Sequence, residues 1–499
     1  MSEDRVRMGE DRVRMSEDRV RTEAFIDGVF VPAADGRTFD AVSPRDGSVV
    51  AAVSRCGAQD VDRAVRAARR AFDGGGWAQA DPAERKRVLL TLAGLIDAHA
   101  EDLAELESAD VGHPISDARG VDVVNARNTF AWYAEAIDKV YGEIAPTGAD
   151  AVALVGREPF GVVGAVVPWN YPLIITAWKL APALAAGNSV VLKPAEQSPL
   201  TALRLAELAA EAGVPAGVLN VVPGYGEEAG EPLGRHHGVD KIAFTGSVEV
   251  GRRFLVYAGE SNGKAVSLEL GGKSPQVVLA DAADLDAAAE AIGWGIFYNA
   301  GQTCHAGSRV VVAEKLAEPL SERLVGFARE LVPADPADPA TRLGALVSEE
   351  HLSGVLARVQ RAQDSGAHVL VGGARAHPVA GGAYMTPTVI EAPDPADPIV
   401  QEEVFGPVLT IQRARDIDHA VVLANDTAYG LAAAVWTRDV SVAHRVSRRL
   451  RAGTVWVNTF DMSSLSTPFG GFKSSGHGRD RSLHALDAYT QLKTTWISL

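Results

Sequence analysis

The chain has 499 residues, of which 47% are hydrophobic, and a net charge of −16. This length exceeds what one small core organises, so two or three domains are expected. The acidic balance argues against binding to nucleic acid or to an anionic membrane surface, and no apolar run is long enough to span a membrane.

The N-terminus carries a triple repeat, Met-Ser/Gly-Glu-Asp-Arg-Val-Arg, from Met1 to Arg21. The seven-residue period would suit a coiled coil, but each copy offers only Met and Val as apolar residues. A disordered tail over 1–21 is therefore predicted. The charged start lacks the apolar segment of a signal peptide, and two cysteines cannot form a disulfide framework, so a cytoplasmic protein is predicted.

From Ala24 onward, strand and helix patterns alternate, which predicts an α/β fold with parallel sheets covered on both faces. The first series of predicted elements comprises strands at 161–167, 189–192, 218–222 and 241–244 and helices at 173–186 and 199–212. The second comprises strands at 276–279, 308–313, 405–411, 431–436 and 454–458 and a helix at 284–299. The two series predict two α/β domains. Pockets commonly form where two domains meet and at the carboxyl ends of parallel strands.

One of the two cysteines, Cys304, closes the sequence Gly-Gln-Thr-Cys after the apolar helix, and Glu269 precedes the pair Gly271-Gly272. The two residue types suit two-step covalent catalysis, in which a thiolate attacks and a base-activated water releases the product. Taken alone, the pair could equally be a buried structural cysteine and a surface glutamate.

Asn170 follows a strand and stands between two prolines and two aromatic residues, so its rigidly held amide could donate to an oxyanion; alone it could also be a turn asparagine. Lys193 and Glu196 follow another strand, where they can bind ribose hydroxyls, and Glu196 would repel a 2′-phosphate. Residues 244–251 read as a strand, a small-residue turn and a helix start, which suits a pyrophosphate. The glycines at 224 and 226 make only a weak dinucleotide fingerprint.

Together these motifs resemble the NAD(P)-dependent aldehyde dehydrogenase superfamily over Ala24 to Leu499. Seven motifs stand in the family's order: 169–170, 193–196, 246–251, 268–273, 301–309, 402–407 and 468–473. The resemblance implies a Rossmann-like NAD-binding domain, an α/β catalytic domain and a small β oligomerisation arm. The implied boundaries are 22–139 with 160–271, 272–474, and 140–159 with 484–499.

The resemblance also implies roles. Cys304 attacks the aldehyde, Asn170 and the Cys304 amide hold the oxyanion, Glu269 activates water, and Lys179 with Asp480 resembles a proton exit. Many relatives have glutamate where Asp480 stands. The implied cofactor is NAD, with no metal, and the residues implied to bind it are Val167, Pro168, Trp169, Lys193, Glu196, Gly226, Phe244, Thr245, Gly246, Ser247, Leu270, Glu403 and Phe405. The residues implied to line the substrate tunnel are Tyr171, Ile175, Trp178, Thr303, His305, Asp461, Ser463 and Leu465.

The stretches 478–486 and 492–499 resemble γ-glutamyl-γ-aminobutyraldehyde dehydrogenases, so an aminoaldehyde substrate is expected, with Asp461 as a possible partner for the amine. The loop 459–465 departs from that subgroup, so a broad aliphatic or aromatic aldehyde dehydrogenase is a second possibility. A CoA-acylating enzyme is a third, against which Glu269 argues. A noncatalytic binding protein is a fourth, against which Cys304, Asn170 and Glu269 together argue.

His305 follows the nucleophile directly and is interpreted as lining the wall rather than as a base. The expected partner is a small-molecule aldehyde, and the expected assembly is a homodimer or homotetramer.

Overall fold

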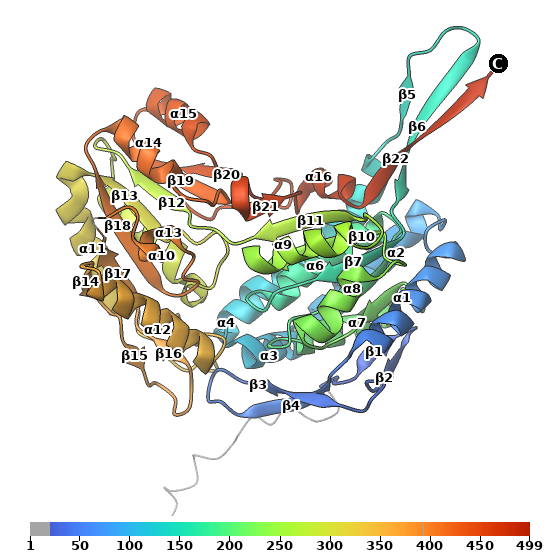
Figure 1. Ribbon diagram of the computed structural model, residues 1–499, viewed down its shortest axis with the longest axis horizontal. Coiled ribbons are helices and arrows are strands. Elements are labelled where there is room, and N and C mark those ends of the chain that lie inside the picture. The colour runs from blue at the N-terminus through green and yellow to red at the C-terminus, as the bar shows by residue number, and fades with distance from the viewer. Residues whose placement is uncertain (1–19, 393) are drawn as a thin grey trace, which may run out of the picture.

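The computed structural model describes residues 20–392 and 394–499 and arranges them in two α/β lobes and a projecting arm (Figure 1). The predicted N-terminal tail lies outside the described residues except for Val20 and Arg21. Arg21 is part of the folded body, since its Nε donates to Glu207 Oε1 at 3.0 Å. No helix in the described part of the chain is long and apolar enough to cross a bilayer.

The first lobe is built on an eight-stranded sheet whose central strands are parallel. The order of its strands is β2 (Val29–Val31), β1 (Ala24–Ile26), β9 (Leu219–Val221), β8 (Ser189–Lys193), β7 (Val162–Val166), β10 (Lys241–Gly246), β11 (Ala265–Leu270) and β21 (Gly476–His477). The predicted strands match β7, β8, β9 and β10 to within two residues at each end. The late strand β21 pairs antiparallel with β11 at the sheet edge that faces the second lobe (Figure 1).

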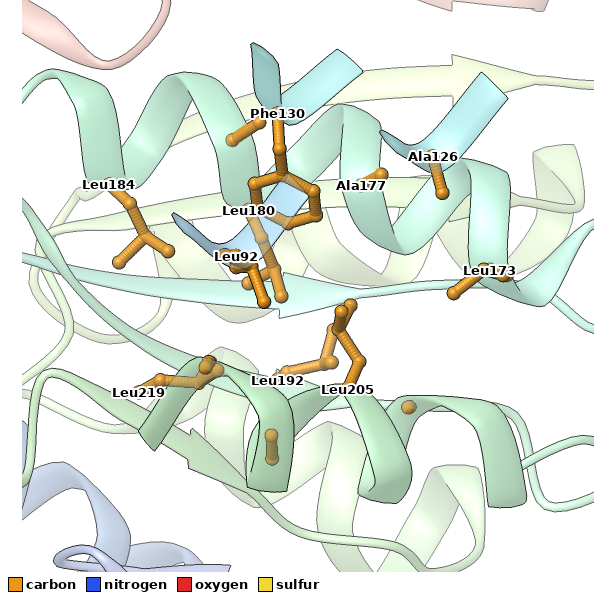
Figure 2. Packing of buried hydrophobic residues seen from close by; sticks show 14 of the residues in the cluster. Leu92, Ala126, Phe130, Leu173, Ala177, Leu180, Leu184, Leu192, Leu205 and Leu219 are labelled. Carbon is orange, nitrogen blue, oxygen red and sulfur yellow. The ribbon is translucent and has the colours of Figure 1, made fainter. Parts of the chain in front are cut away.

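Apolar helices cover this sheet. Helix α6 (Pro172–Ala185) begins with proline at its first position, and Gly187, at φ 93°, follows its end. Figure 2 shows Leu173, Leu180 and Leu184 of α6 packed with Phe130 and with Leu192 of β8. The remaining helices of this lobe are α1 (Ala58–Asp73), α2 (Pro82–Ala98), α3 (Ala100–Val111), α4 (Ile115–Asp117), α5 (Val124–Ala136), α7 (Leu200–Ala212), α8 (Glu231–Arg235) and α9 (Val248–Gly259). This packing fixes the loops that follow β7, β8 and β10.

The second lobe is built on a seven-stranded sheet with its own core. The order of its strands is β14 (His368–Val371), β17 (Thr388–Glu391), β18 (Val408–Ala414), β13 (Arg309–Ala313), β12 (Pro275–Val278), β19 (Ala432–Trp436) and β20 (Thr454–Val457). Its helices are α10 (Leu285–Phe297), α11 (Ala317–Glu330), α12 (Glu349–Asp364), α13 (Pro398–Gln401), α14 (Ile417–Asn425) and α15 (Val440–Arg449). Two hairpins, β3 (Thr38–Val42) with β4 (Val49–Ser54) and β15 (Arg375–Ala376) with β16 (Tyr384–Met385), complete the lobes.

Two predicted elements differ from the observed ones: one strand is displaced by three residues, and one helix ends two residues earlier than predicted. The strand predicted at 405–411 begins at Val408, because Phe405 has a left-handed φ of 58° that no strand tolerates. The helix predicted to reach Asn299 ends at Phe297, because Asn299 and Ala300 are also left-handed. In both places the backbone turns sharply to present a side chain.

The arm is a three-stranded antiparallel sheet of β5 (Glu143–Ala145), β6 (Ala151–Pro159) and β22 (Thr490–Ser498), which projects beyond the first lobe (Figure 1). The short helix α16 (Ser482–Asp487) precedes β22. Several large apolar side chains of the arm are exposed, including Ile144, Leu492 and Trp496. Exposed apolar clusters of this kind mark interaction surfaces.

Candidate active site

The loop that carries Cys304 is held from several sides. Asn299, Ala300 and Gly301 have φ values of 48°, 51° and 74°, so the chain makes one left-handed turn before the cysteine. A Cβ at Gly301 would lie 2.1 Å from the carbonyl oxygen of Gly406, so only glycine fits there. The Gln302 side chain accepts from the Val347 amide at 2.9 Å. Cys304 is a free, partly exposed thiol at the end of this fixed turn.

Asn170 lies against the same loop. Its Nδ2 donates to the Gln302 carbonyl at 2.8 Å, and its own carbonyl accepts from Asn299 Nδ2 at 3.0 Å. The residue is buried, and the amide nitrogen carries a second hydrogen beyond the one given to Gln302. The loop after β7 and the loop of the nucleophile are thereby joined.

Glu269 lies near the end of β11, and neither of its carboxylate oxygens has a hydrogen-bond partner among the described residues. Burial, followed by the charge of Asp480, raises the pKa of Glu269 well above its usual range. A Cβ at Gly272 would come within 2.5 Å of the Cys304 carbonyl oxygen, so the glycine pair lets the two predicted catalytic segments touch. A buried carboxylic acid on the segment that packs against the Cys304 loop suits base-assisted chemistry.

Lys179 and Asp480 form a buried ion pair behind Glu269. The Nζ of Lys179 lies 2.7 Å from Asp480 Oδ2, and both side chains are almost fully enclosed. The negative charge of Asp480 raises the pKa of Glu269. Although aspartate is shorter than glutamate, Asp480 reaches Lys179, and the three groups form a buried titratable cluster.

The predicted cofactor residues lie around the carboxyl ends of the parallel strands. Lys193 Nζ lies 3.0 Å from Glu196 Oε2, which supplies a donor and an acceptor suited to vicinal hydroxyls. Ser247 caps α9, since its Oγ accepts from the Val250 amide at 3.3 Å, and Thr245 Oγ1 is buried without a hydrogen-bond partner among the described residues. This donor set fits a dinucleotide at a helix start.

Residues from the second lobe complete that region. Glu403 Oε1 accepts from the Gly272 amide at 2.9 Å, and burial raises the pKa of Glu403 to about 7. The Phe405 ring centroid lies 5.2 Å from that of Trp169, in an edge-to-face contact. The remaining predicted cofactor residues Val167, Pro168, Gly226, Phe244, Gly246 and Leu270 belong to the strand ends of the first lobe or to the loops that follow them.

The predicted tunnel residues include three aromatic side chains, and hydrogen bonds connect several of the eight to their surroundings. Tyr171 Oη lies 2.7 Å from Thr303 Oγ1, and Trp178 Nε1 donates to Asn125 Oδ1 at 3.1 Å. Ile175 is buried on the same helix as Trp178. Ser463 and Leu465 line a cavity of about 590 Å³. These contacts bring Tyr171 to Thr303 and Trp178 to Asn125, and the substrate roles of these positions stay predictions.

His305 makes contacts that its position in the sequence did not indicate. Its ring lies among aromatic rings, stacked 6.5 Å from Phe460 and edge-on 5.5 Å from Phe469. It also places Nδ1 3.8 Å from Cys304 Sγ and Nε2 2.6 Å from Asp461 Oδ1. Arg481, Asn125 and Phe469 were not among the predicted site residues, and only the proximity of Arg481 to Asp480 in the sequence could have drawn attention to it.

Comparison with known proteins accords with this geometry. The model of the aldehyde dehydrogenase family matches residues 30–495. The chain is 50% identical over 475 residues to the NADP/NAD-dependent aldehyde dehydrogenase PuuC of Escherichia coli (strain K12), covering 95% of each chain.

Two solved structures superpose closely. The γ-glutamyl-γ-aminobutyraldehyde dehydrogenase from Burkholderia cenocepacia J2315 has a TM-score of 0.94 and 54% identity, over 96% of this chain and 97% of the other. An indole-3-acetaldehyde dehydrogenase complexed with NAD+ has a TM-score of 0.95 and 50% identity, with the same coverage. The predicted fold is confirmed, and the predicted NAD cofactor agrees with the NAD+ held by that related enzyme. The chain therefore belongs to the aldehyde dehydrogenase family and is an aldehyde dehydrogenase.

Proposed function

We propose that this enzyme oxidises an aminoaldehyde, such as γ-glutamyl-γ-aminobutyraldehyde, to the carboxylate through a covalent intermediate on Cys304. The observation that carries the mechanism is the meeting of three segments: the Cys304 loop, the Asn170 loop bonded to it at 2.8 Å, and the Gly272 backbone packed on Cys304. A nucleophile, an amide donor and a carboxylic acid then share one junction.

In the first step, the Cys304 sulfur attacks the aldehyde carbon and a thiohemiacetal forms. The free hydrogen of Asn170 Nδ2 and the Cys304 amide stabilise the oxyanion. Because Asn170 is already held by Gln302 and Asn299, its donor needs no reorganisation as charge develops. Loss of hydride from the substrate carbon leaves a thioester on Cys304, and a bound NAD would supply the acceptor for that hydride.

In the second step, a water molecule attacks the thioester, and Glu269 accepts its proton. The raised pKa of Glu269 suits a base that must be reprotonated and deprotonated in each cycle. Lys179 and Asp480, joined at 2.7 Å, provide a route for that proton away from the site.

The residues proposed to hold the dinucleotide come from both lobes. Lys193 and Glu196 bind the adenosine ribose, Ser247 binds the pyrophosphate, and Glu403 with Phe405 binds the nicotinamide riboside. The carboxylate of Glu196 disfavours a 2′-phosphate, so NAD is the preferred cofactor.

The name of the Burkholderia relative supports the aminoaldehyde substrate. Asp461, whose side chain is 46% exposed, is the candidate partner for an amine, although one of its oxygens is engaged by His305. The aromatic walls formed by Trp178, Phe460 and Phe469 favour the second candidate, a broad aliphatic and aromatic aldehyde dehydrogenase.

Because large apolar side chains of the arm are exposed, a homodimer or homotetramer is proposed. Because both cysteines are free thiols, a cytoplasmic location is proposed. Sedimentation of the purified chain tests the assembly.

The test of function is a panel of aldehydes assayed by NADH absorbance, with 4-aminobutanal, γ-glutamyl-γ-aminobutyraldehyde, hexanal and benzaldehyde. Aminoaldehydes should have the highest kcat/KM. A preference for hexanal or benzaldehyde would replace the aminoaldehyde proposal with the broad one, and no NADH with any aldehyde would refute the dehydrogenase mechanism.

A further inference from the structure

A cavity of about 590 Å³ is lined in part by two of the predicted substrate residues, Ser463 and Leu465. Its other lining residues include Arg481 and, from α5, Asn125, Asn128 and Trp132. The cavity adjoins the tunnel, because the Asn125 side chain accepts from the indole of Trp178 at 3.1 Å. Part of a long substrate that extends beyond the tunnel would lie in this space.

Arg481 is a buried cation without a paired anion. The residue is 6% exposed, and its guanidinium carbon lies 5.1 Å from the Trp178 ring centroid and 5.0 Å from that of Phe469. Among the described residues its side chain makes no hydrogen bond within 3.5 Å and no ion pair within 4.0 Å, and its Nε is buried without a partner. A charge left in this state is costly unless something else satisfies it.

The neighbouring acids already have other partners. One carboxylate oxygen of Asp480 lies 2.7 Å from Lys179 Nζ, and one of Asp461 lies 2.6 Å from His305 Nε2. The preceding arginine, Arg479, donates to the carbonyls of Gly471 and Gly478 and so supports the backbone. Arg481 differs from all of these because the donors of its two terminal nitrogens form no hydrogen bond with the described residues.

The position of Arg481 sets the length of what it can bind. The Phe469 ring contacts both groups: its centroid lies 5.0 Å from the Arg481 guanidinium carbon and 5.5 Å from the centroid of the His305 ring. His305 Nδ1 in turn lies 3.8 Å from Cys304 Sγ. These contacts connect Cys304 to Arg481 through His305 and Phe469, so a ligand with its aldehyde at Cys304 would meet Arg481 with a group several bonds from the aldehyde carbon.

We propose that Arg481 binds a carboxylate at the far end of the aldehyde substrate. A planar guanidinium packed against two adjacent rings offers the paired donors that a carboxylate accepts. The inference rests on the proposed oxidation at Cys304 and narrows its substrate class. An aldehyde with a γ-glutamyl end carries such a carboxylate, whereas a simple aminoaldehyde does not.

The test compares 6-oxohexanoate with its methyl ester, two aldehydes of similar size that differ in the distal charge. The wild-type enzyme should have a higher kcat/KM for the acid, mainly through KM. Arg481→Met should lower the acid-to-ester ratio of kcat/KM by about tenfold or more, since a buried charge contact is lost. Arg323→Met, which removes a surface arginine paired with Asp286 on the far lobe, is the matched control and should leave the ratio unchanged.

Arg481→Lys keeps the positive charge without the planar guanidinium, so it should retain more of the acid-to-ester ratio of kcat/KM than Arg481→Met does. This second variant also keeps the test valid if Arg481→Met does not fold. A wild-type ratio of one, or equal losses for acid and ester in both variants, would overturn the carboxylate site and leave Arg481 a packing residue. If the wild type oxidises neither compound nor any other aldehyde, it is the proposed function that fails, not this assignment.

Discussion

His305 joins Asp461 to the nucleophile: Nε2 lies 2.6 Å from Asp461 Oδ1, and Nδ1 of the same ring lies 3.8 Å from Cys304 Sγ. Burial lowers the pKa of the ring, but the charge and hydrogen bond of Asp461 outweigh it and raise the pKa of His305 to about 10. The imidazole is therefore cationic at neutral pH, and it lies beside the thiol.

Replacing His305 with glutamine should slow alkylation of Cys304 by iodoacetamide at pH 7 by about tenfold, because a neighbouring cation favours the reactive thiolate. The pH at which alkylation is half-maximal should move upward. Alkylation followed by mass spectrometry measures both, and Cys56, which is buried, does not compete. His444→Gln, an exposed position on α15 of the second lobe, is the control. Unchanged alkylation in His305→Gln would show that the ring only lines the wall.

Cys304→Ala should abolish NADH formation and leave NAD binding almost unchanged, because the thiol forms the covalent bond while the proposed cofactor residues lie elsewhere. Steady-state turnover and calorimetric titration with NAD give the two readouts. Retention of more than a few per cent of the activity would mean that another group attacks the aldehyde.

Glu269→Gln should trap the acyl-enzyme, because the amide fills the same pocket but does not accept a proton from water. A burst of NADH close to one equivalent per site, followed by turnover slowed by about 100-fold or more, is expected in stopped-flow absorbance. Equal loss of burst and turnover would move Glu269 to an earlier step.

The pH dependence of turnover should follow the ionisation of Glu269. Burial raises the pKa of Glu269, and the Asp480 charge raises it further, so deacylation should increase with pH as the carboxyl loses its proton. Asp480→Asn removes one of the raising charges and should shift the rising limb of the kcat profile to lower pH. A shift to higher pH would show that Asp480 acts on Glu269 mainly through Lys179.

Glu196→Gln should raise kcat/KM for NADP by about tenfold while changing that for NAD much less, because the like-charge contact with a 2′-phosphate disappears. Initial rates at a fixed aldehyde concentration give the ratio. Comparable use of the two cofactors by the wild type would mean that the Glu196 side chain, 28% exposed, moves aside.

The sequence predicted the elements that depend on local patterns. The apolar strands that become β7, β8 and β10 and the helix stopped at Gly187 were found because alternation, period and turn chemistry are local signals. The ends at Phe297 and Val408 were missed because left-handed non-glycine residues, such as Ala300 and Phe405, give no signal in composition.

The contacts within the candidate site were predicted less completely. Motifs predict Cys304, Glu269 and Asn170 as catalytic residues, but the contact of His305 with Asp461 joins residues 156 positions apart, and no motif predicts it. The unpaired state of Arg481 depends on which partners its neighbours have already taken, and only the folded arrangement decides that.

The left-handed turn at Asn299 and Ala300 limits how far this protein can be made heat-resistant without cost to turnover. Each non-glycine residue in that region raises the energy of the native state by roughly 1 kcal/mol, which the surrounding packing outweighs. Ala300→Gly would relieve part of that energy, yet it would also free the segment that orients the sulfur. Selection for thermal tolerance would therefore favour glycine at position 300, whereas selection for rate would favour the alanine present.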